Sequence, residues 1–322
     1  MKKLTLSIAL FLFAALLSLP SCSSSDDAEP LPLPGLLKPG SNSIQYTFYT
    51  PLANKPVTLY YHIPVDCDMR TMPILFAMHG ADRMAEYQID TWRDIANERQ
   101  IMVFAPHFSS THYPANRAYQ YGGVSNSDYS WLEVQQEQWT ISLIENMFDF
   151  IKQQTGNSNP TYDLWGHSAG GQFTHRLMFH LPKARIRMAI ASNSGSYMVP
   201  SLEGYGAGNY SYPHSLRGTQ YKSADIAAYF ARNMVVHIGT RDLCTDRDCD
   251  SSLPVSLEAV AQGPSRYERG KFFYNYAKNA AAAAGVPFNW QLIEVVGVSH
   301  SSRNMARTAI TGAADLLYSD RL

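Results

Sequence analysis

A serine lies between two glycines in the stretch Gly166-His167-Ser168-Ala169-Gly170. An apolar segment, residues 162–165, precedes this stretch, and a segment typical of a helix, residues 172–177, follows it. Because glycine has no Cβ, the chain can turn tightly on either side of Ser168 and lift its hydroxyl clear of the strand. Such a hydroxyl becomes a nucleophile when a neighbouring base takes its proton. The pattern therefore predicts covalent catalysis at Ser168.

A serine nucleophile needs a base and a third group that orients this base. A Gly-x-Ser-x-Gly turn between a strand and a helix resembles the nucleophile elbow of the α/β hydrolases, in which an acid and then a histidine follow the serine along the chain. Asp242 follows an apolar strand at residues 234–238, and His300 follows the last apolar strand, residues 290–296. Their order and position match the family. The resemblance implies the catalytic triad Ser168, Asp242 and His300.

Other residues compete for the role of the acid. Asp246, Asp248 and Asp250 share a polar loop with Asp242. The close Gly-x-x-Asp spacing from Gly239 to Asp242, in the turn that leaves a strand, favours Asp242. The same carboxylates are candidates for holding a cation, but the loop lacks the turn glycine and the terminal glutamate of an EF-hand. We therefore expect a solvated acidic loop and no metal site.

The reaction also needs donors for the negative charge that develops on the substrate oxygen. Ala169 follows the nucleophile at the predicted start of a helix, so its backbone N–H is free to donate. A second donor is expected after the third strand, where the chain reads Met78-His79-Gly80-Ala81. Gly80 allows a close approach of the backbone. We predict that the N–H groups of Ala169 and Ala81 form an oxyanion hole.

Alternating apolar runs and helical periodicity predict the elements that position these residues. Strands are expected at residues 44–50, 57–64, 73–78, 101–105, 162–165, 187–191, 234–238 and 290–296, and helices at 86–99, 132–154, 172–181, 225–230, 267–284 and 303–318. The first two strands form an antiparallel pair in this interpretation. The alternation of strands and helices after them predicts the α/β class, with a mostly parallel sheet of about eight strands and helices on both faces.

A more specific resemblance extends over residues 57 to 315. It rests on the motifs His79-Gly80, Trp92-Arg93-Asp94-Ile95-Ala96, Phe104-Ala105-Pro106-His107-Phe108, Arg117-Ala118-Tyr119, Trp165-Gly166-His167-Ser168-Ala169-Gly170-Gly171-Gln172-Phe173 and Asn193-Ser194-Gly195-Ser196-Tyr197. These motifs are similar to those of the secreted polyhydroxybutyrate-depolymerase-like and feruloyl-esterase-like branch of α/β hydrolases. The resemblance implies a serine esterase without a cofactor and leaves the substrate open.

Two long segments, residues 108–129 and 192–221, are rich in tyrosine and follow predicted strands. Loops after parallel strands gather at the edge of the sheet where an active site opens. An aromatic rim there fits acyl esters on plant polysaccharide, and ordinary surface tyrosines explain the same composition. The alternatives to an esterase are a serine peptidase of the prolyl-oligopeptidase kind and a non-catalytic binding protein on a hydrolase scaffold.

The N-terminus resembles a bacterial lipoprotein signal peptide: two lysines, an apolar run too short to span a membrane, and Pro20-Ser21-Cys22. We expect residues 1–21 to be a signal peptide, Cys22 to carry the lipid, residues 22–42 to be a flexible tether and residues 43–322 to be the hydrolase domain. The predicted location is the bacterial cell envelope, with the lipid holding the protein to a membrane.

The composition limits the possible partners. The formal net charge is −1, with 45% hydrophobic and 16% charged residues. Near-neutrality argues against a nucleic-acid partner, which requires a basic surface. Cys244 and Cys249 lie close together in the acidic loop, where an oxidising envelope would allow a disulfide, and two free thiols are the alternative. Cys67 is expected to be a free thiol.

Overall fold

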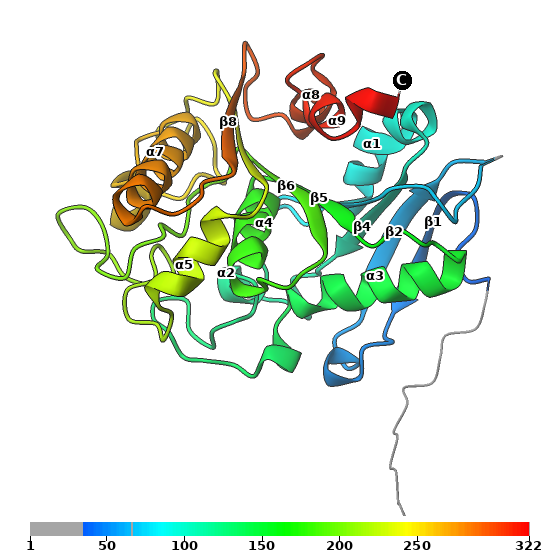
Figure 1. The fold of residues 1–322 in the computed structure, drawn as a ribbon, viewed down its shortest axis with the longest axis horizontal. Helices are drawn as coiled ribbons and strands as arrows, with labels where there is room; N and C mark the ends of the chain where they lie inside the picture. The colour runs from blue at the N-terminus through cyan, green and yellow to red at the C-terminus, as the bar shows by residue number, and fades with distance from the viewer. Residues whose placement is uncertain (1–34, 66, 322) are drawn as a thin grey trace, which may run out of the picture. The chain divides into compact units, whose positions relative to one another are not determined.

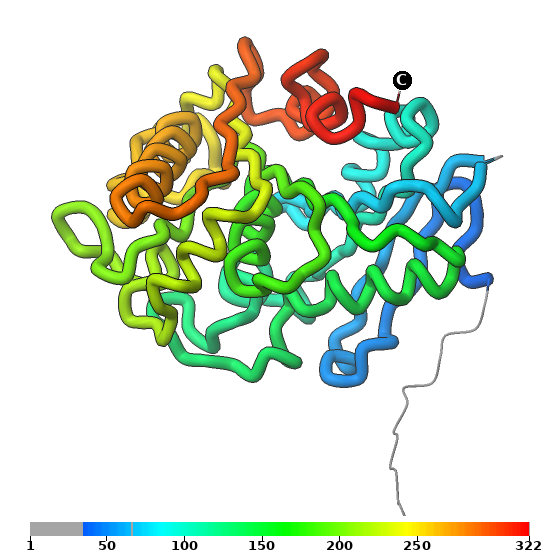
Figure 2. The backbone as a smooth tube through the Cα atoms, viewed as in Figure 1, coloured from blue at the N-terminus to red at the C-terminus, as the bar shows by residue number. Residues whose placement is uncertain are grey.

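The computed structural model describes residues 35–65 and 67–321, and its centre is one eight-stranded sheet (Figure 1). The strand order is β1-β2-β4-β3-β5-β6-β7-β8, which puts β1 and β8 at opposite edges (Figure 2). β2 runs antiparallel to both β1 and β4, and all other neighbours are parallel. The strands are β1 (Gly40–Tyr46), β2 (Val57–Ile63), β3 (Ile74–Met78), β4 (Met102–His107), β5 (Tyr162–His167), β6 (Ile186–Ser192), β7 (Met234–Gly239) and β8 (Trp290–Val295).

Helices cover both faces of this sheet, which confirms the predicted α/β class. Successive strand residues point to opposite faces, so Leu75 and Phe76 of β3 lie in different core clusters. Leu75 lies in a cluster with residues of α1, α8 and α9, and Phe76 in one with residues of α3, α4, α5 and α7. The helices are α1 (Ala85–Arg99), α2 (Ala115–Ala118), α3 (Ser142–Thr155), α4 (Ala169–His180), α5 (Ser223–Phe230), α6 (Leu257–Val260), α7 (Arg266–Ala284), α8 (Ser302–Arg307) and α9 (Ala313–Tyr318).

Two predicted helices were wrong in extent. The helix expected at 132–154 begins only at Ser142, because Trp139 has an extended backbone and its indole donates to the carbonyl oxygen of Val134 at 2.7 Å. The helix expected at 303–318 is divided into α8 and α9. At the break the chain packs closely on itself, since a Cβ on Gly312 would lie 2.4 Å from the carbonyl oxygen of Thr308.

Two further details differ from the sequence interpretation. Pro106, expected to end a strand, lies inside β4 opposite Leu59 of β2. Strand β1 begins at Gly40, before the predicted domain boundary at residue 43, and Leu37 is already buried. The predicted signal peptide and Cys22 lie outside the described residues. Within the described part of the chain, no helix combines the length and apolar character needed to cross a bilayer.

Candidate active site

Ser168 lies at the turn between β5 and α4, with a backbone φ of +58° and ψ of −117°. Positive φ is strained for a residue with a side chain, and such strain costs about 1–3 kcal/mol. The neighbouring glycines allow the turn, because a Cβ on Gly166 would lie 2.2 Å from the carbonyl oxygen of Gly170, and one on Gly170 would lie 2.3 Å from that of Met78. The N–H of Ser168 donates to the carbonyl oxygen of Ser192 at 2.9 Å, which fixes the turn to β6.

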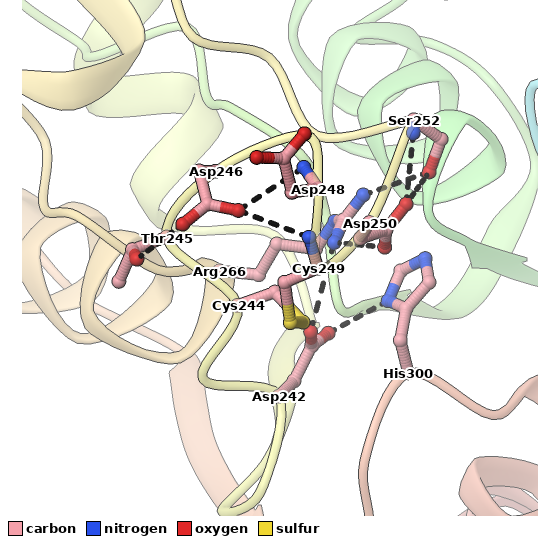
Figure 3. The surroundings of a disulfide bond; sticks show 10 residues. All are labelled: Asp242, Cys244, Thr245, Asp246, Asp248, Cys249, Asp250, Ser252, Arg266 and His300. Atoms are coloured by element: carbon pink, nitrogen blue, oxygen red, sulfur yellow. Dashed lines mark hydrogen bonds and ion pairs between the residues drawn. A yellow bond between two sulfur atoms is a disulfide. The ribbon is translucent and has the colours of Figure 1, made fainter.

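The structure brings His300 and Asp242 together from the loops after β8 and β7. His300 Nδ1 donates to Asp242 Oδ2 at 2.7 Å (Figure 3). Asp242 is only 2% exposed, whereas His300 is partly exposed. This bond holds the imidazole in one orientation, and within residues 35–65 and 67–321 Nε2 has no hydrogen-bond partner. The second ring nitrogen, Nε2, is therefore available to accept a proton from a neighbouring hydroxyl.

His167, the residue before the serine, lies against the imidazole of His300. The two ring centroids are 4.5 Å apart. Burial, together with the nearby His300, holds the pKa of His167 well below its ordinary value. A neutral ring at this position adds no positive charge that would oppose protonation of His300. The contact also places His300 beside the turn that carries Ser168.

The two predicted oxyanion-hole residues line one cavity together with Ser168. Ala169 is the first residue of α4, where backbone N–H groups have no partner within the helix. Ala81 belongs to the turn after β3, which His79 fixes: Nδ1 donates to the carbonyl oxygen of Gly80 at 2.8 Å and Nε2 accepts from the N–H of Phe108 at 3.2 Å. Burial lowers the pKa of His79 to about 3, so this ring is neutral.

The carboxylates of the acidic loop make different contacts. Asp242 is the one that bonds His300. Asp246 accepts the N–H groups of Asp248 and Cys249, at 3.1 and 2.9 Å. Cys244 and Cys249 form a disulfide. Across the described residues, no group of three or more His, Cys, Asp or Glu side chains could hold a metal ion.

Two buried residues next to this site had escaped the sequence interpretation. Asn193 has a φ of +44°, its Oδ1 accepts the N–H of Gly239 at 2.8 Å and its Nδ2 donates to the carbonyl oxygen of Ser299 at 3.2 Å. It thus ties the residue before His300 to the end of β7. Arg266 is fully buried and lies between Asp242 and Asp250 (Figure 3). Asn193 begins one of the motifs that carry the family resemblance, but the sequence alone does not show its contacts, and a single arginine carries no sequence signal of such a role.

A cavity of about 770 Å³ opens at Ser168. Its walls come mainly from the segments 115–129, 208–217 and 247–258. Most tyrosines of the two long loops are buried wall or core residues and do not form an exposed rim: Tyr113, Tyr119, Tyr121, Tyr197, Tyr205 and Tyr212. Four tyrosines line the cavity, namely Tyr121, Tyr129, Tyr210 and Tyr212, and of these Tyr129 is 87% exposed.

This arrangement can carry out acyl transfer without a cofactor. It combines a strained serine at a helix N-terminus, a histidine held by a buried carboxylate, and free backbone N–H groups at one end of a cavity. Hydrolysis through a covalent intermediate requires a nucleophile, an oriented base and charge-stabilising donors, and these three features fit those roles.

Comparison with known proteins agrees with this chemistry. The chain is similar to poly(aspartic acid) hydrolase-1 from Sphingomonas sp. KT-1, with 34% identity over 83% of this chain and 96% of the other, and a TM-score of 0.75. It is similar to LpqC, a poly(3-hydroxybutyrate) depolymerase from Bordetella parapertussis, with 28% identity over 88% of this chain and 91% of the other, and a TM-score of 0.78. The S-formylglutathione hydrolase FrmB from Staphylococcus aureus, 16% identical over 87% of this chain and 98% of the other, shares the fold with a TM-score of 0.54. No protein-family model and no curated protein matches the chain.

Proposed function

This chain belongs to the α/β-hydrolase family of serine esterases and is a carboxylic ester hydrolase, and from this premise we propose that it cleaves extracellular acyl esters through an acyl-enzyme on Ser168. One observation carries the assignment of residues: the hydrogen bond of 2.7 Å between His300 and Asp242, beside the strained turn of Ser168. In that geometry a buried acid orients the proposed base, whose ring lies against His167, the residue before the proposed nucleophile.

The proposed reaction has two halves. His300 Nε2 takes the proton of Ser168 Oγ as this oxygen attacks the ester carbonyl carbon. The N–H groups of Ala169 and Ala81 bind the oxyanion, and Asp242 stabilises the protonated imidazole. The tetrahedral intermediate collapses, and the alcohol leaves with the proton from His300. A water then gives a proton to His300 as it attacks the carbonyl carbon of the acyl-enzyme. When this second tetrahedral intermediate collapses, His300 returns the proton to Ser168 Oγ, which releases the carboxylic acid and regenerates the serine.

The shape of the cavity supports a substrate larger than a simple acetate ester. Its volume of about 770 Å³ lies in the upper part of the range for small-molecule sites. The exposed ring of Tyr129 on its wall offers a surface on which a sugar or hydroxycinnamoyl ring can stack. We therefore propose acyl groups on plant polysaccharide as the substrate class.

A second candidate is the backbone of a polymer, because the two similar proteins above are named as a poly(aspartic acid) hydrolase and a poly(3-hydroxybutyrate) depolymerase. A peptide-like amide substrate, as in a serine peptidase, uses the same nucleophile and base.

A substrate panel separates these possibilities. The purified protein is incubated with acetylated xylan, methyl ferulate, p-nitrophenyl acetate, poly(3-hydroxybutyrate), poly(aspartic acid) and a peptide p-nitroanilide, with Ser168→Ala as the blank. We expect turnover of the esters and the highest kcat/KM on a carbohydrate-linked acyl group. Release from a polymer or the peptide in preference to every small ester would replace the proposed substrate class. Equal rates for wild type and Ser168→Ala on all substrates would refute the function.

The location in the cell envelope is likewise a proposal, which the sequence Pro20-Ser21-Cys22 after an apolar run supports. A lipid on Cys22 would attach the enzyme to a membrane surface without a spanning helix. Expressed in a bacterium with labelled palmitate, the wild type should carry the label and sediment with membranes, and Cys22→Ala should do neither. Label on the Cys22→Ala protein would exclude this cysteine as the anchor.

A further inference from the structure

Arg266, the first residue of α7, lies between two carboxylates in the protein interior (Figure 3). Its Nη1 is 2.7 Å from Asp250 Oδ2 and 3.7 Å from Asp242 Oδ1, and its Nη2 donates to Ser252 Oγ at 2.9 Å. A buried guanidinium is stable only when such partners satisfy it. The guanidinium of Arg266 is closer to Asp250 than to Asp242. Because both carboxylates lie within ion-pair distance of it, they share its positive charge.

The disulfide loop fixes the position of Asp250. The bond between Cys244 and Cys249 closes the loop, and Asp250 follows directly after Cys249. Asp250 Oδ1 also accepts the N–H and the hydroxyl of Ser252, at 2.8 and 2.7 Å. Burial acts to raise the pKa of Asp250, but the hydrogen bonds from Ser252 and the charge of Arg266 outweigh it and lower the pKa to about 2. Asp250 is therefore a carboxylate at neutral pH.

We propose that Arg266 and Asp250 are positioning residues for the triad: Arg266 holds Asp242 in the orientation that His300 needs, and Asp250 balances the charge of Arg266 so that Asp242 can still stabilise a protonated His300. This inference rests on the proposed role of Ser168, Asp242 and His300. It assigns a catalytic consequence to the disulfide loop, whose residues do not touch His300.

Few other titratable groups face this pair. His167 lies against His300 and is neutral. Arg269 of α7 donates to the carbonyl oxygens of Gly195, Pro254, Gly263 and Pro264 and contacts no carboxylate. Tyr197 and His237 are buried, burial raising the pKa of Tyr197 and lowering that of His237 to about 4, so both are neutral at pH 7. Among the described residues, Arg266 is the one cation within ion-pair distance of Asp242 apart from His300 itself.

Two variants, Asp250→Asn and Arg266→Met, each remove one of these charges. They should move the acidic limb of the plot of kcat/KM against pH in opposite directions. Asp250→Asn leaves the cation of Arg266 unbalanced and disfavours protonation of the base, so the limb shifts to lower pH. Arg266→Met removes the cation and favours protonation, so the limb shifts to higher pH. Each shift should be about one pH unit, as expected for a unit charge several ångströms away at an effective dielectric constant of about 20.

The rate of p-nitrophenyl acetate hydrolysis is measured between about pH 4 and pH 9, a range that spans the ordinary titration of a histidine. Arg266→Met should also lose about 10–100-fold in kcat/KM through misplacement of the acid. Arg266→Lys, which keeps the charge, should return the limb to its wild-type position. Lys271→Met is the matched control, because it removes a half-exposed cation from the same helix that pairs with Glu294 at 3.6 Å. Its limb should not move.

Thermal unfolding checks that each variant is folded. If Arg266→Met does not fold, Asp250→Asn and Arg266→Lys still decide, through the shift of the first and the unshifted limb of the second. If the wild-type enzyme is active, the inference is overturned when the acidic limbs of the Asp250→Asn and Arg266→Met profiles stay in place or move in the same direction. A wild type with no ester turnover would instead refute the proposed function on which the inference rests.

The disulfide provides an independent arm of the test. Cys244→Ser/Cys249→Ser should shift the acidic limb in the same direction as Asp250→Asn, because a loosened loop withdraws Asp250 from Arg266. In the Asp250→Asn background the same two cysteine substitutions should cause no further shift, since both changes break one contact. Additive shifts would show that the disulfide acts by another route and would remove it from the proposal.

Discussion

Replacing Ser168 with alanine is expected to lower kcat for p-nitrophenyl acetate by about 10⁴–10⁶-fold. The substitution removes the oxygen that forms the acyl-enzyme and leaves the oxyanion hole and the cavity in place. The same variant should lose all covalent labelling by a fluorophosphonate, which intact-mass spectrometry measures directly. Because Ser168 is largely buried at a strained turn, alanine at this position keeps the backbone strain and should leave the thermal unfolding temperature close to that of the wild type.

Two further substitutions sharpen this test. Ser168→Gly should be equally inactive but more stable by about 1 kcal/mol, because glycine adopts positive φ without strain. Ser211→Ala removes a hydroxyl from the wall of the same cavity and should keep full labelling. Labelling that persists in Ser168→Ala, or that disappears in Ser211→Ala, would show that the nucleophile lies elsewhere.

Removing the base should have an effect of similar size. His300→Ala is expected to lose about 10⁴–10⁶-fold in kcat, because it removes the imidazole that is proposed to take the serine proton. Asp242→Asn should lose about 10⁴-fold, because an amide in place of the carboxylate that accepts from His300 Nδ1 no longer holds the productive tautomer or stabilises the protonated ring. Stopped-flow rates of labelling and steady-state rates on p-nitrophenyl acetate give both numbers.

The acidic loop offers a matched control for the acid. Asp248→Asn removes an exposed carboxylate that bonds neither His300 nor Arg266, and its rate should stay within about twofold of the wild type, as is usual for surface changes. The triple variant without Ser168, Asp242 and His300 should be no slower than Ser168→Ala, because the three groups act as one unit. If Asp248→Asn lost most of its catalytic rate while Asp242→Asn remained active, Asp248 and not Asp242 would be the acid of the triad.

The sheet was predictable because its physical signal is local. Apolar runs such as residues 73–78 predict strands that are buried on both faces, and the glycines at 166 and 170 predict a tight turn. These features depend on neighbouring residues alone. The strand order and the edge positions of β1 and β8 were not predicted from the sequence, and the folded chain shows them.

The errors arose where contacts far along the chain decide the local structure. Trp139 fits the helical spacing with Leu143, yet it is buried from an extended segment, with its ring centroid 6.0 Å from that of His180 in α4. The tyrosines of the long loops were expected to form an aromatic rim or to be ordinary surface residues, but most of them fill the interior. There Tyr119 stacks on His79 with ring centroids 4.3 Å apart and donates to its carbonyl oxygen. Residue spacing predicts neither the extended backbone at Trp139 nor the burial of these tyrosines.

The residues around the triad were the least predictable part of the site. Ser168, Asp242 and His300 follow a family order that can be compared with the sequence. Arg266 opens an ordinary helix, with Ser265 before it as the N-cap. Nothing in that pattern indicates that its guanidinium reaches back to Asp242. Such a role depends on three segments that meet only in the folded chain.

The loop that follows β7 has a second consequence, for the way this enzyme can diverge. Residues 252–256, which follow Asp250 and Ser251, form part of the cavity wall, so one continuous segment both contacts Arg266 and lines the proposed substrate cavity. Under the proposals above, we expect changes there to alter substrate selection and catalytic rate together. The walls built from residues 115–129 and 208–217 include no residue that bonds Asp242, His300 or Arg266. We therefore expect new specificities to accumulate on those two walls at little cost in turnover, except at Tyr119, which donates to His79 and stacks on it beside the predicted oxyanion-hole turn. The remaining wall is expected to change more slowly.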